Sequence, residues 1–106
     1  MAKYLITASY TAEGAKGLIK EGASGRHTAV QKAVEGLGGK VEAMYFALGD
    51  ADAYVVCEFP DLTSVLALSM AVGASGGARI TTTQLVSVAE LDAAAKKSVS
   101  YRAPGA

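Results

Sequence analysis

The succession of strand-like and helix-like segments constrains the fold of this chain more than any other feature of its sequence. Strands are predicted where polar and apolar residues alternate or β-branched residues gather, at residues 3–10, 40–48, 52–59 and 79–88. Helices are predicted where apolar residues recur at helical spacing, at residues 24–37 and 62–73. The order βαββαβ predicts an α+β, ferredoxin-like fold, in which a four-stranded antiparallel sheet of order 4-1-3-2 carries two helices on one face.

The remaining segments have weaker patterns. Residues 12–22 are predicted to form a weak first helical piece after the cap Thr11, because their glycines lower helix propensity. Residues 89–97 are predicted to form a short terminal helix. Since 106 residues suit one domain, we expect a single domain over residues 1–97 and a flexible tail at residues 98–106.

Alternation along the strands also assigns side chains to the two faces of the sheet. The helix-covered face is expected to carry Val41, Ala43, Tyr45, Ala53, Val55, Cys57 and Phe59. The opposite face is expected to carry Leu5, Met44, Phe46, Leu48, Tyr54, Val56 and Leu85. Because a monomer rarely leaves so apolar a patch in water, we predict a homodimer, or a higher oligomer, in which the sheets of two copies pack together.

Charge and hydropathy exclude several classes of partner. Ten Lys and Arg balance ten Asp and Glu, so no positive field draws the chain to nucleic acid or to an anionic membrane. The longest uncharged segment, residues 62–78, contains serines and glycines and is too short to span a bilayer. The first residues pass directly into a strand, unlike a secretory signal, and a cytoplasmic location is expected.

One cysteine and one histidine limit the metal and redox chemistry of a single chain. Cys57 has no partner for an intramolecular disulfide, and together with His27 it is too few for a four-ligand zinc site. The sequence leaves open only a metal site that is shared between two copies of the chain. No His or cation neighbours Cys57 in the sequence, so a buried, inert thiol is expected. No metal site is predicted, and the sequence identifies no cofactor.

Several passages of the sequence resemble the GYD domain family. They are Tyr4–Thr11, Leu37–Val41, Tyr45–Asp50, Ala67–Gly73 and Arg79–Thr82. The resemblance covers roughly residues 3–90 and implies a bacterial, homo-oligomeric protein with a ferredoxin-like fold of the dimeric α/β-barrel type. It implies no settled biochemical function and supplies no catalytic residue. The motif that names the family, Gly-x-Tyr-Asp, falls on residues 49–52, where Ala51 replaces the tyrosine.

A first candidate pocket centres on the single histidine. His27 is spaced to share a helical face with Val30 and is expected to point toward the sheet, near Tyr4 or Tyr45. An imidazole beside a phenol can serve as a general acid or base. A partly exposed histidine near a helix start, satisfied by backbone or water, explains the same pattern.

Acidic and basic residues supply further candidates. Asp50 and Asp52 flank one residue in a hairpin turn, where they can bind a cation or a basic group, or act only as turn formers. Arg26 and Arg79 stand where they can bracket an anionic ligand or remain solvated charges. Tyr4, Tyr10, Tyr45 and Tyr54 can line a pocket or pack with their hydroxyls at its rim.

Three functions fit these observations. The first is a small-molecule-binding or regulatory module that works as a homo-oligomer. The second, by fold analogy, is a small cofactor-independent or haem-associated enzyme of the dimeric α/β-barrel type, similar to monooxygenases or isomerases, with His27 and Tyr45 in its site. The third is a structural assembly subunit.

Overall fold

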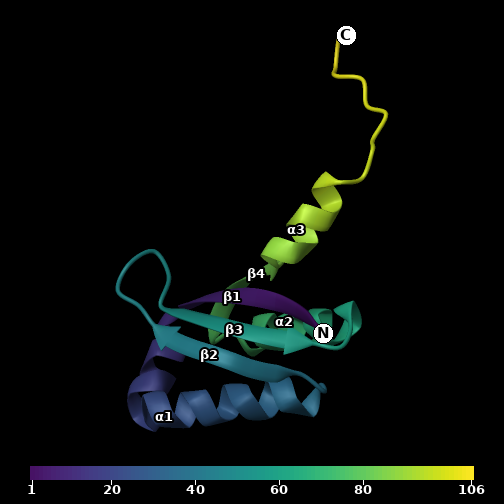
Figure 1. The fold of residues 1–106 in the computed structure, drawn as a ribbon. Helices are drawn as coiled ribbons and strands as arrows, with labels where there is room; N and C mark the ends of the chain where they lie inside the picture. Colours follow the sequence, from purple (N-terminus) through teal and green to yellow (C-terminus); the bar gives the residue numbers. More distant parts are fainter.

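Four strands and three helices make up the computed structural model, which describes residues 1–106 (Figure 1). The strands are β1 (Ala2–Tyr10), β2 (Lys40–Phe46), β3 (Ala53–Phe59) and β4 (Ala78–Leu85). The helices are α1 (Ala12–Gly36), α2 (Leu62–Ser75) and α3 (Val88–Ala95). The protein is therefore an α+β protein.

The strands form one antiparallel sheet in the order β2-β3-β1-β4. These are the same neighbours that the order 4-1-3-2 specifies when the sheet is read from its other edge. Ile6 on β1 lies between Val55 of β3 and Thr82 of β4. Helices α1 and α2 cover the face that bears Ile6, since Val34 of α1 and Val65 of α2 belong to the same buried cluster.

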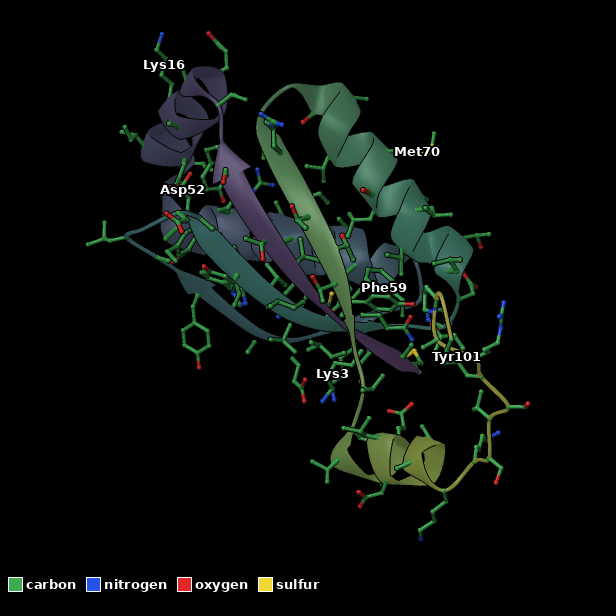
Figure 2. The ribbon with its side chains drawn as sticks, turned by 90° about the horizontal axis from the view of Figure 1, so that it is seen from above. Lys3, Lys16, Asp52, Phe59, Met70 and Tyr101 are labelled. Atoms are coloured by element: carbon green, nitrogen blue, oxygen red, sulfur yellow. The ribbon has the colours of Figure 1, made fainter.

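The tightly packed core lies at one end of the covered face, near the start of β1. Val34, Cys57 and Phe59 are its fully buried members. The ring of Tyr4 meets the ring of Phe59 edge to face, with 6.1 Å between their centroids, and Phe59 lies between the sheet and the helices in Figure 2. The other end of the covered face, where β1 finishes, is occupied mainly by small side chains, and this difference creates the site described below.

Helix α1 joins the two helical pieces that the sequence suggests. The break between them is at Gly22, whose φ of 82° and ψ of 163° are not helical. A side chain is strained at this positive φ, whereas glycine adopts it freely. Thr11 caps the first piece, because its hydroxyl accepts a hydrogen bond from the Gly14 backbone N–H at 3.1 Å. The glycine-rich first piece is thus helical despite its weak propensity.

Strand β2 overturns part of the predicted face assignment. Val41 pairs with Cys57 and Ala43 pairs with Val56, so one extra residue, Glu42, forms a β-bulge. A bulge moves every later side chain of the strand to the opposite face. Met44 therefore packs against the core.

The same bulge corrects the remaining residues of β2. Placing Ala43 and Tyr45 on the helix-covered face was wrong, and so was placing Met44 and Phe46 on the open face. Tyr45 pairs with Tyr54 on the open face, and 69% of its surface is exposed. Phe46 pairs with Ala53 on the covered side of the sheet. A pattern of strict alternation cannot reveal such an insertion.

The open face of the sheet remains rich in apolar side chains after this correction. Leu5, Val56 and Leu85 are half-buried there, and Tyr45 and Tyr54 are exposed. At one end Lys3 forms an ion pair with Glu42, with 3.0 Å between Nζ and Oε2. No element of the chain covers this face (Figure 1).

Helix α3 projects away from the sheet and its two covering helices (Figure 1). Ser87 and Glu90 form a capping box, in which each side chain accepts a hydrogen bond from the other residue's backbone N–H. None of the residues of α3 is buried, and Val88 and Leu91 are exposed. This extension explains the elongated dimensions of the molecule, 56 × 32 × 24 Å.

Candidate functional site

A cavity of about 340 Å³ lies between the covered face of the sheet and helices α1 and α2. Its lining comes from β1, β2, β3, β4 and both helices, and fifteen of its nineteen lining residues are hydrophobic. The cavity occupies the end of the sheet opposite the Tyr4–Phe59 core. Its size is within the range of about 300–1,000 Å³ that is common for small-molecule sites.

Small side chains account for this space. Ala29 and Ala33 face it from α1, Ala71 faces it from α2, and Ala8 and Ala53 form part of the sheet surface beneath it. Protein interiors are close-packed, and between a helix and a sheet leucine or phenylalanine fills space that alanine leaves empty. Six alanines in all line the cavity, where they leave space that larger side chains would fill.

Close backbone contact closes one side of the cavity. The Thr11 N–H donates to the Gly77 carbonyl oxygen at 3.1 Å, and the Thr11 hydroxyl donates to the Gly76 carbonyl oxygen at 2.8 Å. Gly14 lies directly against Gly77, and both residues line the cavity. The start of α1 is therefore attached to the loop that precedes β4.

The polar groups of the cavity gather near the end of β1. Tyr10 and Arg26 both line it. The Asp52 carboxylate accepts a hydrogen bond from the Tyr10 backbone N–H, with 2.8 Å between N and Oδ2, and Figure 2 shows Asp52 beside this end of β1. Burial raises the pKa of the Tyr10 phenol above its usual value; the Arg26 guanidinium opposes this shift, and the carboxylates of Asp52 and Glu21 add to it. The phenol therefore stays protonated at neutral pH and can donate a hydrogen bond to a molecule in the cavity.

Arg26 has few partners for a side chain in an apolar cavity. Its only ion-pair contact is with Glu21, at 3.4 Å between Nε and Oε1, and the buried Nε has no hydrogen-bond acceptor. Guanidinium groups have five N–H donors in a planar arrangement that matches a carboxylate. Arg26 can therefore bind an acceptor group of a molecule in the cavity.

Three of the predicted pocket residues do not meet. Tyr4 is buried in the core, where it packs against Phe59 and does not line the cavity. His27 is half-buried on α1, next to Arg26 in sequence, and also does not line the cavity. Tyr45 lies on the opposite face of the sheet because of the bulge at Glu42. The expected pairing of His27 with Tyr45 is therefore absent.

The two aspartates of the hairpin occupy different environments. Asp50 is exposed in the turn and borders a second, more polar hollow of about 400 Å³ on the open face, together with Tyr54 and Arg79. Asp52 is half-buried, and its backbone N–H donates to the Ala8 carbonyl oxygen at 2.8 Å. Since its carboxylate also binds the Tyr10 N–H, Asp52 holds the hairpin against the end of β1. The structure thus separates Asp50 from Asp52, and only Asp52 lies near the cavity.

Sequence reasoning identified part of this site. Arg26 and Tyr10 appear among the candidates above, each beside a simpler explanation as solvated charge or rim packing. The alanines at positions 29 and 33 are the signal that could have located the cavity, since they place small side chains on one helical face. Ser75, the last residue of α2, and Gly77, from the loop that follows it, also line the cavity.

Cys57 belongs to the core and not to the cavity. It is fully buried, and its Sγ is 4.0 Å from the Tyr4 carbonyl oxygen. Burial raises the pKa of the thiol to about 11. No three side chains of the His, Cys, Asp and Glu types gather closely enough to hold a metal ion. None of the helices has both the length and the apolar character needed to span a bilayer.

Comparison with known proteins gives one match. The family model described as the GYD domain matches residues 4–95 of this chain. No curated protein and no solved structure matches it.

Proposed function

The chain belongs to the GYD domain family, and we propose that it is a small-molecule-binding protein that acts as a homo-oligomer with a ferredoxin-like fold. The cavity between the sheet and helices α1 and α2 is the observation that carries the binding function. Its walls are mostly apolar, and its few polar groups gather at one end, which is the usual composition of a site that binds and orients a small organic molecule.

The cavity also favours binding over the two other functions. An acid–base enzyme with His27 and Tyr45 as its reacting groups needs them on one side of the sheet, and they lie on opposite sides. The protonated phenol of Tyr10 and the guanidinium of Arg26 suit hydrogen bonding to a ligand better than removal of a proton from it. A purely structural subunit has no need for the alanine-lined space.

Binding is tested with two probes of matched shape, 2-naphthoate and 2-naphthamide, by isothermal titration calorimetry. We expect at least one probe to bind the wild type, and Ala53→Leu, which adds side-chain volume to the lining of the cavity, to abolish this binding. Ala67→Leu makes the same change at an exposed position of α2 outside the cavity and is expected to leave binding unchanged. Absence of binding for both probes at millimolar concentration contradicts the proposal, as does equal binding by the two variants.

The open face of the sheet supports the homo-oligomer. Its apolar side chains come from all four strands, and a stable interface typically buries about 1,600 Å² in total. Packing two such faces around a twofold axis removes these side chains from water. Each Å² of apolar surface buried in this way stabilises the dimer by about 25 cal/mol. The predictions of a cytoplasmic location, a bacterial origin and the absence of nucleic-acid and membrane partners stay predictions.

Native mass spectrometry tests the assembly. We expect masses at even multiples of 10.7 kDa for the wild type. Val56→Lys places a charge in the middle of the open face and is expected to shift the protein to monomer. Leu66→Lys makes a comparable change on the exposed side of α2 and is the control. A monomeric wild type contradicts the proposed dimer but leaves the binding proposal intact.

A further inference from the structure

We propose that the cavity selects a compact hydrophobic carboxylic acid, whose carboxylate is bound by Arg26 while its apolar part lies among the alanines of α1 and the sheet. The inference rests on the proposed binding function and concerns the chemical class of the ligand.

Arg26 is the only cationic residue in the lining of the cavity. Its guanidinium donates no hydrogen bond to any other residue of the protein, and its Nε is buried without an acceptor. A buried donor without an acceptor costs free energy, which an incoming acceptor recovers. A ligand carboxylate fits this requirement best, because it accepts two parallel N–H···O bonds from a guanidinium.

The contact between Arg26 and Glu21 leaves room for such a ligand. The two residues lie on either side of the kink at Gly22. Their side chains keep 35% and 38% of their surface exposed, and the 3.4 Å contact does not have hydrogen-bond geometry. Ion pairs of this exposure contribute little free energy. Glu21 therefore competes only weakly with a carboxylate that approaches from inside the cavity.

Other polar groups near Arg26 also affect how strongly an anion binds at this end of the cavity. Asp52 is the second carboxylate that influences this end of the cavity, and one of its oxygens already accepts the Tyr10 N–H. The neutral phenol of Tyr10 is a second donor in the lining. One guanidinium and one phenol thus provide the donors for an anionic group, and the carboxylates of Glu21 and Asp52 provide the repulsion. Removing the charge of Glu21 is expected to strengthen the binding of an anion.

The volume of the cavity sets the size of the apolar part. An engineered apolar cavity of about 150 Å³ holds one benzene molecule. The cavity here, at about 340 Å³, is roughly twice as large. The ligand is therefore expected to be about as large as two fused rings or a substituted single ring. This is the reason for choosing naphthalene derivatives as probes.

The experiment measures dissociation constants of 2-naphthoate and 2-naphthamide for four proteins: the wild type, Arg26→Gln, Glu21→Gln and Arg79→Gln. We expect the wild type to bind the carboxylate at least tenfold more tightly than the amide. Arg26→Gln is expected to weaken the carboxylate at least tenfold and to change the amide by less than twofold. Glu21→Gln is expected to strengthen the carboxylate. Arg79→Gln, on the open face of the sheet, is the control and is expected to change neither.

The outcomes separate this inference from the proposed function. If both probes bind the wild type equally and Arg26→Gln changes neither, the carboxylate inference is overturned and the binding function stands. If neither probe binds, the binding function itself fails. Should Arg26→Gln fold poorly by circular dichroism, Arg26→Lys replaces it: the charge remains but the bidentate geometry is lost, and a weaker carboxylate preference than in the wild type is expected. An unchanged preference in Arg26→Lys then contradicts the inference.

Discussion

Gly14 and Gly17 lie three residues apart in the first turns of α1, yet only one of them needs to be glycine. A Cβ added at Gly14 would overlap the carbonyl oxygen of Gly77, whereas a Cβ at Gly17 would meet nothing within 4 Å. The helix approaches the loop before β4 so closely that no side chain fits between them. Sequence patterns show both glycines as weak points of a helix and do not distinguish them.

We expect Gly14→Ala to lower the free energy of unfolding by about 1–3 kcal/mol, because the new methyl group forces α1 away from Gly77. The matched control, Gly17→Ala, is expected to raise it by about 0.5–1 kcal/mol, since alanine loses less backbone entropy in a helix. Urea denaturation measures both. Similar effects of the two substitutions would contradict the close contact.

The buried thiol of Cys57 provides a prediction of pH dependence. Its pKa is raised by burial from 9.0 to about 11, so the folded state resists ionisation that the unfolded chain undergoes. The resulting stability is complete below pH 9 and is lost as the pH rises through 11. Between about pH 8 and pH 11, we expect the wild type to lose about 2 kcal/mol more than Cys57→Ala in free energy of unfolding. Parallel pH profiles for the two proteins would contradict this assignment.

At the scale of the elements, β2 is the strand whose side-chain placement the alternation of its sequence does not predict. The positions of the strand and its hairpin partner follow from the alternation and the turn, and the start of α2 follows from Asp61, whose carboxylate accepts the Ser64 N–H at 2.8 Å. The bulge at Glu42 does not follow from them. The bulge depends on the register in which β2 pairs with β3 while each strand buries its own apolar side chains. One extra residue then exchanges the positions of Met44 and Tyr45.

The bulge is tested by a matched pair of substitutions. Met44→Ser is expected to lower the free energy of unfolding by about 2 kcal/mol or more, because Met44 packs against the core. Tyr45→Ser is expected to cost clearly less, because 69% of the Tyr45 surface is exposed on the open face. Both are measured by thermal and urea denaturation in the Val56→Lys background, which is expected to be monomeric, so that packing of the open face against a second copy does not contribute. A larger loss for Tyr45→Ser would mean that β2 alternates without interruption.

At the scale of the whole molecule, the sheet with α1 and α2 is distinct from the extension formed by α3 and the residues after it (Figure 1). The radius of gyration is 17.0 Å, whereas a compact domain of this length is expected to have about 13 Å. An eight-residue helix has little stability by itself in water, so the capping box of Ser87 and Glu90 is its main local support.

Deleting residues 88–106 tests this division. Because none of the residues of α3 is buried, we expect the shortened protein to keep its free energy of unfolding within about 1 kcal/mol of the full chain. Urea denaturation and circular dichroism measure the effect, and deletion of residues 98–106 alone is the control. A loss of more than about 2 kcal/mol on removing α3 would show that this helix packs against the same chain or a second copy.

The sequence by itself determined the succession of strands and helices, the caps Thr11 and Asp61 and the balance of charge, because these depend on neighbours in the chain. Its resemblance to the GYD domain family was also sufficient to identify the family. Only the tertiary structure decided the bulge at Glu42, the contact of Gly14 with Gly77 and the cavity that brings Tyr10 and Arg26 together. Each of these depends on how distant segments pack, and the volume left between packed elements is not encoded in any local pattern.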